Sequence, residues 1–278
     1  MRALTSAPPE CLSPAADPEA RLAVEVGRAA FRTPTVLGGQ AARAGLTCET
    51  CHRSGRDNPA FLFPGVSGAP GTADVTSSLF SSHRGDGVDD PRPIPDLSGA
   101  RSGLKVAAAD LPPFIHGLIT QEFDGREPPP AVLAGLVAYV RALSPGACPR
   151  AGAVPVTVAG LMSDARRAIA AADALAARGD RPAAGVMIAA ARARLGLIDE
   201  RYAALPRERR RLRAADARLA EVAQALREDR PDARWRLADW SDDSVKLEAA
   251  LTRREAGSLF DRNHLAAALG RRLPREPS

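Results

Sequence analysis

The sequence is poor in aromatic residues and in cysteine, and it has no long apolar run. Aromatic residues make up 4% of the 278 positions, so any hydrophobic core depends mainly on Ala, Leu and Val. Four cysteines are too few for a disulfide-rich scaffold, and no segment approaches the roughly 20 apolar residues of a membrane-spanning helix. A composition of 45% hydrophobic and 26% charged residues excludes fibrous, collagen-like and fully disordered chains.

Charge and proline are distributed unevenly, and both change near Ser144 to Pro155. Residues 1–150 hold 14 Lys or Arg, 15 Asp or Glu and 18 of the 24 prolines, whereas residues 151–278 hold 24 basic and 18 acidic residues. In the second part Arg alternates with Asp and Glu, as on a solvated helix face, and no nucleic-acid-binding module is recognisable. We expect no nucleic-acid partner and no membrane span. The expected organisation is an irregular N-terminal tail (1–16), a first domain (17–148) and a second domain (156–278).

The spacing of apolar residues and helix caps predicts an all-α protein. The first domain is expected to hold helices at 17–31, 110–123 and 130–143. Residues 32–109 are rich in Gly, Pro, Ser and Asp and predict mainly loop, so something other than side chains is expected to fill their centre. The second domain is predicted as an antiparallel bundle or hairpin of helices. These helices are expected at about 157–178, 180–205 and 206–227, from a cap at Ser241 and Asp242 onward, and at 258–269, with Trp235 and Trp240 in a loop.

The most informative motif is Cys48-Glu49-Thr50-Cys51-His52, which has the C-x-x-C-H spacing of covalent haem attachment. Two thiols at this spacing can form thioethers with the two vinyl groups of one haem, and the histidine that follows can ligate its iron. A redox-active dithiol would be expected beside a βαβ pattern, which is lacking. A zinc site would need two further ligands at short spacing. We therefore expect one covalent haem c held by Cys48, Cys51 and His52, against the alternatives of a dithiol, a zinc site or a chance match.

The segments that flank the motif resemble a class I c-type cytochrome domain. Residues 27–31 (GRAAF) look like the N-terminal helix of that family, and residues 136–143 (LVAYVRAL) look like its C-terminal helix. The order GRAAF, CETCH, PIPDL, LVAYVRAL is similar to the C-terminal haem domain of bacterial di-haem cytochrome c peroxidases. The resemblance implies that the two helices cross closely, which glycine permits. Because the chain has a single C-x-x-C-H, the two-haem relay of those peroxidases cannot be built from it, and their activity is not carried over.

The second axial ligand of the iron stays open at this point. Class I cytochromes usually place a Met before the last helix, but no Met lies between His52 and Pro130. The candidates are His116, on a predicted apolar helix, and His83, in a polar loop, and the third possibility is a vacant position that small ligands can reach. Arg84 and Arg92 are candidates for pairing a haem propionate, with simple surface exposure as the alternative.

The remaining cysteines, Cys11 and Cys148, lie just outside the first and last helices of the predicted haem domain. If those helices cross as in the cytochromes, the two sulfurs can form a disulfide that closes the domain; the alternative is two unrelated free thiols. Haem c attachment implies an oxidising, periplasmic or otherwise exported location, although no signal peptide is recognisable at the start of the chain.

These features predict a monohaem c-type cytochrome that transfers electrons to a redox partner protein, with a helical domain that binds a partner. The alternative is a haem enzyme or sensor, peroxidase-like, with an open sixth iron position. The state of that position distinguishes the two.

Overall fold

The computed structural model describes residues 2–77, 79–83, 85–99, 106–107, 109–148 and 152–272, and it is mostly helical, as predicted. A loop-rich part carries α2 (Pro18–Phe31), α3 (Gly39–Arg43), α4 (Cys48–Cys51), α5 (Leu111–Gly117) and α6 (Pro130–Ala142). A π-helical turn, Leu118–Glu122, continues α5. The second part, here called the helical half, carries α7 (Val158–Ala177), α8 (Arg181–Arg201), α9 (Pro206–Arg227), α10 (Ala233–Thr252) and α11 (Arg262–Arg272).

The helices begin where the sequence places capping side chains and proline. Asp17 precedes Pro18, and its carboxylate accepts a hydrogen bond from the Ala20 amide at 2.8 Å. Thr157 caps α7 and Asp180 caps α8 in the same manner. The predictions for the helices up to residue 227 are therefore confirmed to within a few residues.

Two predictions about irregular segments are wrong. The first part of the tail is not irregular, because Arg2–Thr5 forms α1 and β1 (Ser6–Ala7) pairs antiparallel with β4 (Val154–Pro155), whereas residues 8–16 form no helix or strand. The two tryptophans do not lie in a loop, and Ser241 and Asp242 do not begin a helix, because α10 already starts at Ala233. Trp240 is 1% exposed and packs into the core, while its indole NH donates to the Ala215 carbonyl at 3.0 Å. This burial favours one continuous helix over a cap at Ser241.

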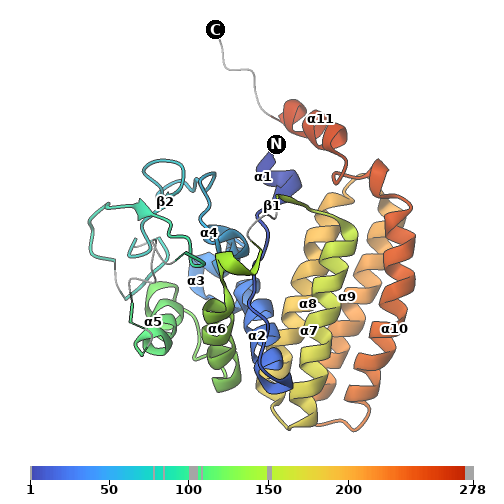
Figure 1. Cartoon of the computed structure of the whole chain (residues 1–278). Helices are drawn as coiled ribbons and strands as arrows, with labels where there is room; N and C mark the ends of the chain where they lie inside the picture. Colours follow the sequence, from blue (N-terminus) through green and yellow to red (C-terminus); the bar gives the residue numbers. More distant parts are fainter. Residues whose placement is uncertain are drawn as a thin grey trace.

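The helices α2 and α6 cross at two glycines, Gly27 and Gly135. A Cβ added at Gly27 would overlap the Gly135 carbonyl, and one added at Gly135 would lie 2.8 Å from the Gly27 nitrogen. Only glycine allows the two backbones to approach this closely. The other side of α2 contacts α7 and α8, so that α2 lies between α6 and the helical half (Figure 1).

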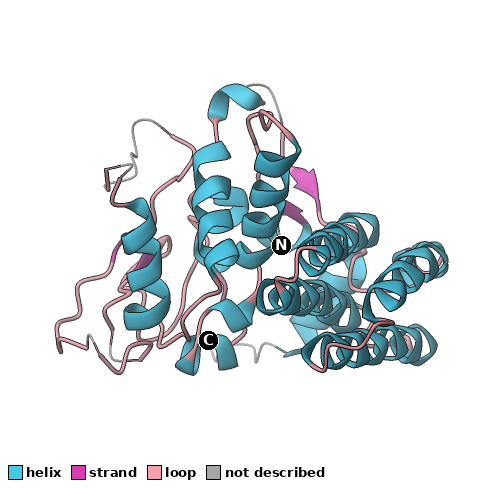
Figure 2. Ribbon diagram, turned by 90° about the horizontal axis from the view of Figure 1, so that it is seen from below, coloured by secondary structure: helices cyan, strands magenta, loops and turns pink. Residues whose placement is uncertain are grey.

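The helical half shares its hydrophobic core with α2 and α6. In the helical half, α7 contacts α8 and α10, and α9 contacts α8 and α10; Figure 2 shows these four helices end-on beside the loop-rich part. One continuous cluster of buried side chains runs from Val26 and Leu136 through Met162 and Ile188 to Trp240. A second cluster, which includes Phe61, Phe80 and Ile94, lies among the loops. The change in composition near Ser144 to Pro155 therefore marks a change of architecture within a shared core. No helix in the described ranges is long and apolar enough to cross a membrane.

The loops that follow α4 carry few regular elements. In these loops β2 (Thr72–Ala73) pairs antiparallel with β3 (Arg92–Pro93). Elsewhere among the described residues there are short 3-10 turns at Pro34–Val36, Arg53–Gly55, Pro145–Ala147 and Glu255–Gly257. The prediction that residues 32–109 are mainly loop is confirmed for the part of this segment that the structure describes.

Candidate functional site

The C-x-x-C-H motif forms α4, a single helical turn that begins directly at Cys48. Thr47 precedes the turn, and the Thr47 and Thr50 side chains cap it reciprocally; the Thr47 amide donates to the Thr50 hydroxyl at 3.0 Å. This local capping fixes the two cysteines one turn apart. Cys48, Cys51 and His52 consequently line the same cavity.

That cavity has a volume of about 360 Å³ and an almost entirely apolar wall. Its size lies in the range of small-molecule and cofactor pockets. The wall draws on α2, on the loops around residues 37–97, on α5 with the turn that follows it, and on α6. Representative side chains from these segments are Phe31, Phe61, Ile94, Leu118 and Leu136. The chain thus surrounds an apolar space that its own side chains do not fill.

His52 is oriented by a backbone carbonyl. Its Nδ1 lies 3.0 Å from the Pro95 oxygen, and since a carbonyl can only accept, Nδ1 carries the proton and donates. Nε2 is then the unprotonated nitrogen available to a metal. Burial lowers the pKa of His52, against the raising effects of Pro95 and Asp96, so the ring is held in the neutral form that ligation requires. The ring of Phe31 lies beside it, with the ring centroids 6.4 Å apart.

The two motif thiols are protonated at neutral pH. Burial raises the pKa of Cys48 to about 12 and that of Cys51 to about 11. Neither cysteine is in a disulfide in this structure. Within the described residues no three His, Cys, Asp or Glu side chains are grouped so that they could hold a metal ion on their own. A protein-only zinc site would need such a group.

The donor set and the cavity together fit a haem. Two thiols, one neutral imidazole with its Nε2 unprotonated and a large apolar space meet at one place. A flat apolar macrocycle with two vinyl groups and one iron makes use of all of these features. Haem would be held by Cys48, Cys51 and His52, with Phe31 packed against the imidazole.

Neither candidate for the second axial ligand lines the cavity. His83 has its Nδ1 3.0 Å from the Asp124 carboxylate, and its side chain is 64% exposed. His116 has its Nε2 2.7 Å from the Glu127 carboxylate, whereas its neighbour Ile115 faces the cavity. Of the lining residues within the described ranges, His52 is the one histidine and none is a methionine.

The other residues singled out in the sequence lie at the edges of the site. Arg92 lines the cavity beside β2 and is held by Asp90 at 2.6 Å, whereas Arg84 lies outside the described residues. Cys11 and Cys148 form a disulfide with a Cα–Cα distance of 5.4 Å, which ties the N-terminal segment to the end of the loop-rich part.

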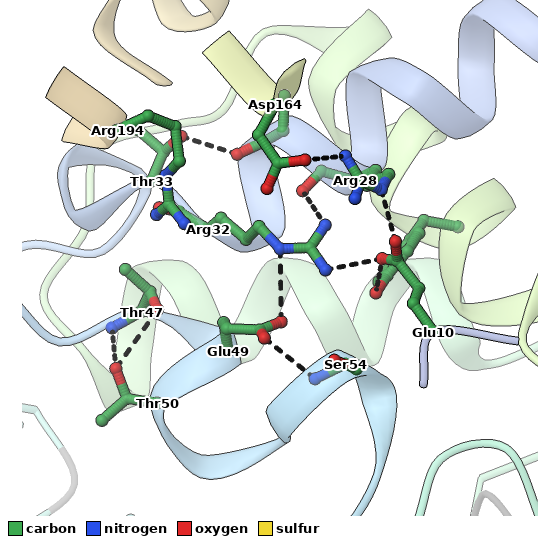
Figure 3. Close-up of polar contacts among 12 residues, drawn as sticks. Glu10, Arg28, Arg32, Thr33, Thr47, Glu49, Thr50, Ser54, Asp164 and Arg194 are labelled. Atoms are coloured by element: carbon green, nitrogen blue, oxygen red, sulfur yellow. Dashed lines mark hydrogen bonds and ion pairs between the residues drawn. The ribbon is translucent and has the colours of Figure 1, made fainter. Parts of the chain in front are cut away.

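A buried ion cluster contacts the motif turn through Glu49 (Figure 3), and none of its members lines the cavity. Its members are Glu10, Arg28, Arg32, Glu49 and Asp164, which come from four separate segments, because both arginines belong to the end of α2. Sequence reasoning missed this cluster. The available signal was the pair Arg28 and Arg32, which are four residues apart and lie among the apolar residues at the end of the predicted helix. Arginines in such surroundings are rarely buried unless they are paired with carboxylates.

Comparison of the chain with protein-family models, with curated proteins and with solved structures finds no match. The functional interpretation of the site therefore depends on its own geometry and chemistry.

Proposed function

We propose that this chain is a monohaem c-type cytochrome that transfers electrons through one covalently attached haem. The observation that carries the proposal is that Cys48, Cys51 and His52 all line one large apolar cavity. A chance C-x-x-C-H match would have no reason to face such a space. The loop-rich architecture around the cavity also has an explanation, because a buried porphyrin replaces much of the missing side-chain core.

The two thiols would be consumed in attachment. Each S–H would add across one vinyl group, so that sulfur bonds one vinyl carbon and the proton goes to the other, with no oxidant required. Both thiols line the cavity that would receive the haem, which places them where this addition requires them. His52 would supply one axial nitrogen, held in place by the Pro95 carbonyl.

The cavity also has an edge from which electrons can leave. Phe114 and Arg92 both line it and both reach solvent, with Phe114 46% exposed and the Arg92 side chain 74% exposed. A haem bound in the cavity would bring its edge near the surface there, where a redox partner protein can dock. The remainder of the ring would stay in apolar surroundings, which help to set the reduction potential.

Two further features support a class I cytochrome arrangement in an exported protein. The close crossing of α2 and α6 at Gly27 and Gly135 is the crossing that the resemblance implies. The disulfide between Cys11 and Cys148 is stable in an oxidising compartment. We infer a periplasmic or otherwise exported location for the mature protein.

The test is to produce the chain in cells that can export proteins and mature c-type cytochromes. We expect a red protein whose pyridine haemochrome spectrum is that of a thioether-linked haem, at one haem per chain. Cys48→Ser with Cys51→Ser is expected to abolish attachment, whereas the matched pair Cys11→Ser with Cys148→Ser is expected to keep the haem. Equal haem content in the two double variants would contradict the proposal.

A second candidate function, binding of a small ligand at the iron, is favoured by the positions of the two histidines. His83 and His116 are engaged by Asp124 and Glu127 and do not line the cavity. An iron held by His52 alone would leave its other face to ligands such as CO, NO or peroxide. A haem enzyme or sensor is the function that such a site would serve.

The optical spectrum separates the two candidates. A low-spin spectrum in both oxidation states that CO and cyanide leave unchanged supports electron transfer alone. A high-spin ferric form, with ready binding of CO by the ferrous form, supports the second candidate.

A further inference from the structure

The buried ion cluster connects the haem-attachment turn to the helical half. Arg32 ends α2 with its side chain 7% exposed, and it bonds Glu10 at 2.6 Å. The Arg32 Nε also lies 3.4 Å from the carboxylate of Glu49, which directly follows Cys48 in the motif. Cys48, Cys51 and His52 therefore line the cavity, whereas Glu49 of the same motif contacts Arg32 (Figure 3).

Glu49 fixes the local shape of the motif as well as its outer contact. Its second carboxylate oxygen accepts a hydrogen bond from the Ser54 amide at 2.9 Å. Ser54 lies at φ 53°, a left-handed conformation that a non-glycine residue adopts only when the surroundings favour it. Ser54 lies two residues after His52, so the Glu49 carboxylate links the motif both to Arg32 and to the turn that follows the motif.

The helical half in turn holds the two arginines. Arg28 bonds Glu10 at 2.6 Å and Asp164 of α7 at 2.9 Å. Arg194 of α8 donates to the Arg32 carbonyl at 2.6 Å. Tyr139 of α6 completes the support, because its hydroxyl donates to Glu10 at 2.7 Å.

The cluster is enclosed, and its three carboxyl groups face two arginines; burial raises the pKa of the Glu49 carboxyl against the lowering effect of Arg32. The side chains of Glu10, Arg28, Arg32 and Asp164 are all at most 17% exposed, and that of Glu49 is 23% exposed. Removal of one partner from a buried pair leaves an uncompensated charge, which costs far more than the loss of a surface ion pair. An arrangement of this kind defines position more strictly than apolar packing does, since each guanidinium contacts two carboxylates in fixed directions.

We propose that Arg32 is a positioning residue for the haem-attachment turn, and that the helical half supports it through Asp164, which pairs with Arg28, since Arg28 and Arg32 share the Glu10 carboxylate. The proposal assumes the haem function proposed above. In this proposal the helical half supports the position of the motif turn through these ion pairs, in addition to binding any partner. Glu49 carries this link, since its carboxyl group contacts both Arg32 and the Ser54 amide.

The test compares four variants with the wild type, all produced with haem maturation. Arg32→Met removes the charge and both carboxylate contacts, Arg32→Lys keeps the charge, and Asp164→Asn weakens the link to α7. The matched control is Arg234→Met, because Arg234 pairs with Asp173 in the helical half and its side chain is 55% exposed. The first readout is the ratio of covalent haem to folded chain.

Arg32→Met is expected to lower the haem-to-chain ratio by about twofold or more, as the loss of a buried ion partner implies. Arg32→Lys is expected to restore much of the ratio, Asp164→Asn to give a smaller loss in the same direction, and Arg234→Met to match the wild type. Equal ratios in Arg32→Met and Arg234→Met would overturn the proposal. A wild-type ratio in Asp164→Asn would overturn the part assigned to the helical half.

Glu49→Gln gives an independent readout if Arg32→Met does not fold. It keeps the shape of the side chain and removes its ionisable carboxyl group, whose pKa burial raises. At a pH above that raised pKa, the midpoint potential of the attached haem is expected to rise, because reduction adds an electron near the Glu49 carboxylate. A purely structural role would change the amount of haem and leave the potential of the attached fraction unchanged. An unchanged potential together with an unchanged haem ratio would overturn the proposal. A wild type without haem would overturn both this proposal and the function on which it rests, whereas a loaded wild type confines any failure to this one.

Discussion

The close crossing of α2 and α6 predicts that substitution of glycine by alanine lowers the stability of the protein at the crossing and raises it elsewhere in a helix. Gly135→Ala places a Cβ 2.8 Å from the Gly27 nitrogen and 3.0 Å from the Ala23 carbonyl oxygen, and both of these are backbone atoms. The helices must separate by about 0.5 Å to reach ordinary contact, which forfeits about a quarter of the dispersion energy along the seam. The overpacking cost is about 1–3 kcal/mol.

The same substitution also has a favourable part, which a control can isolate. Alanine is favoured over glycine in a helix by about 1 kcal/mol. Gly196 lies inside α8 with nothing within 4 Å of an added Cβ, so Gly196→Ala is expected to stabilise the protein by about 0.5–1 kcal/mol. Gly135→Ala is expected to destabilise it by up to about 2 kcal/mol net, because the overpacking cost exceeds the gain in helix propensity. Gly27→Ala, whose Cβ would overlap the Gly135 carbonyl, is expected to destabilise it further.

Urea unfolding of the haem-loaded protein at neutral pH gives these free energies. The reasoning requires the order Gly196→Ala, wild type, Gly135→Ala, Gly27→Ala, from most to least stable. Stabilisation by all three substitutions, as helix propensity alone would produce, would refute the close crossing.

Three further predictions follow from other contacts. The double variant Cys11→Ser with Cys148→Ser opens a loop spanning 137 residues, so it is expected to lower the free energy of unfolding by up to about 5 kcal/mol. Its urea midpoint should fall to about that of the reduced wild type. A midpoint equal to that of the oxidised wild type would argue against the bridge. Burial alone would raise the pKa of Asp164, but Arg28 and Arg32 outweigh it and hold that pKa below the ordinary 3.8. The resulting stability is present above pH 3.8 and is lost as the pH falls through the lowered value. An Asp164→Asn variant should therefore show a flatter acid limb than wild type in pH-dependent unfolding, and parallel curves would contradict the pairing. Substitution of His83 or His116 by Ala is expected to leave the visible spectrum of the loaded protein unchanged; a shift from low to high spin in either variant would identify that histidine as an axial ligand.

Local signals in the sequence were sufficient for most of the helices. Asp17 with Pro18, and Asp180 with Pro182, mark helix starts through side-chain caps and a preset φ, which depend on neighbouring residues alone. Ser241 and Asp242 resembled such a cap but lie inside α10. The burial of Trp240 against distant helices decides that segment, and no local pattern shows it.

For the site as well, the sequence predicts what depends on local spacing and not the contacts between distant residues. Cys48, Cys51 and His52 could be assigned from their spacing, because the chemistry of attachment fixes that spacing along the chain. The partner of His52, the Pro95 carbonyl, and the partner of Glu49, the Arg32 side chain, lie 43 and 17 residues away. Such contacts depend on how the loops fold back onto the motif. The sequence shows that no Met precedes α6, but it does not show that His83 and His116 contact Asp124 and Glu127.

The shared core was also beyond the reach of composition. The chain changes character near Ser144, which predicted two separate domains, yet Val26 and Leu136 belong to the same buried cluster as Met162 and Ile188. Since α2 packs against both α6 and α7, the first helix of the loop-rich part also serves as a neighbour of the helical half. Its Arg28 and Arg32 make the polar half of that contact.

The intact mass of the denatured protein, after production in cells that export and mature such chains, tests the central claim most directly. A covalent haem stays with the chain when the fold is lost, so we predict a single species heavier than the sequence by the mass of one haem, which returns to the sequence mass in the Cys48→Ser, Cys51→Ser variant. A colourless protein that has the unmodified mass and a folded loop-rich part would contradict the account.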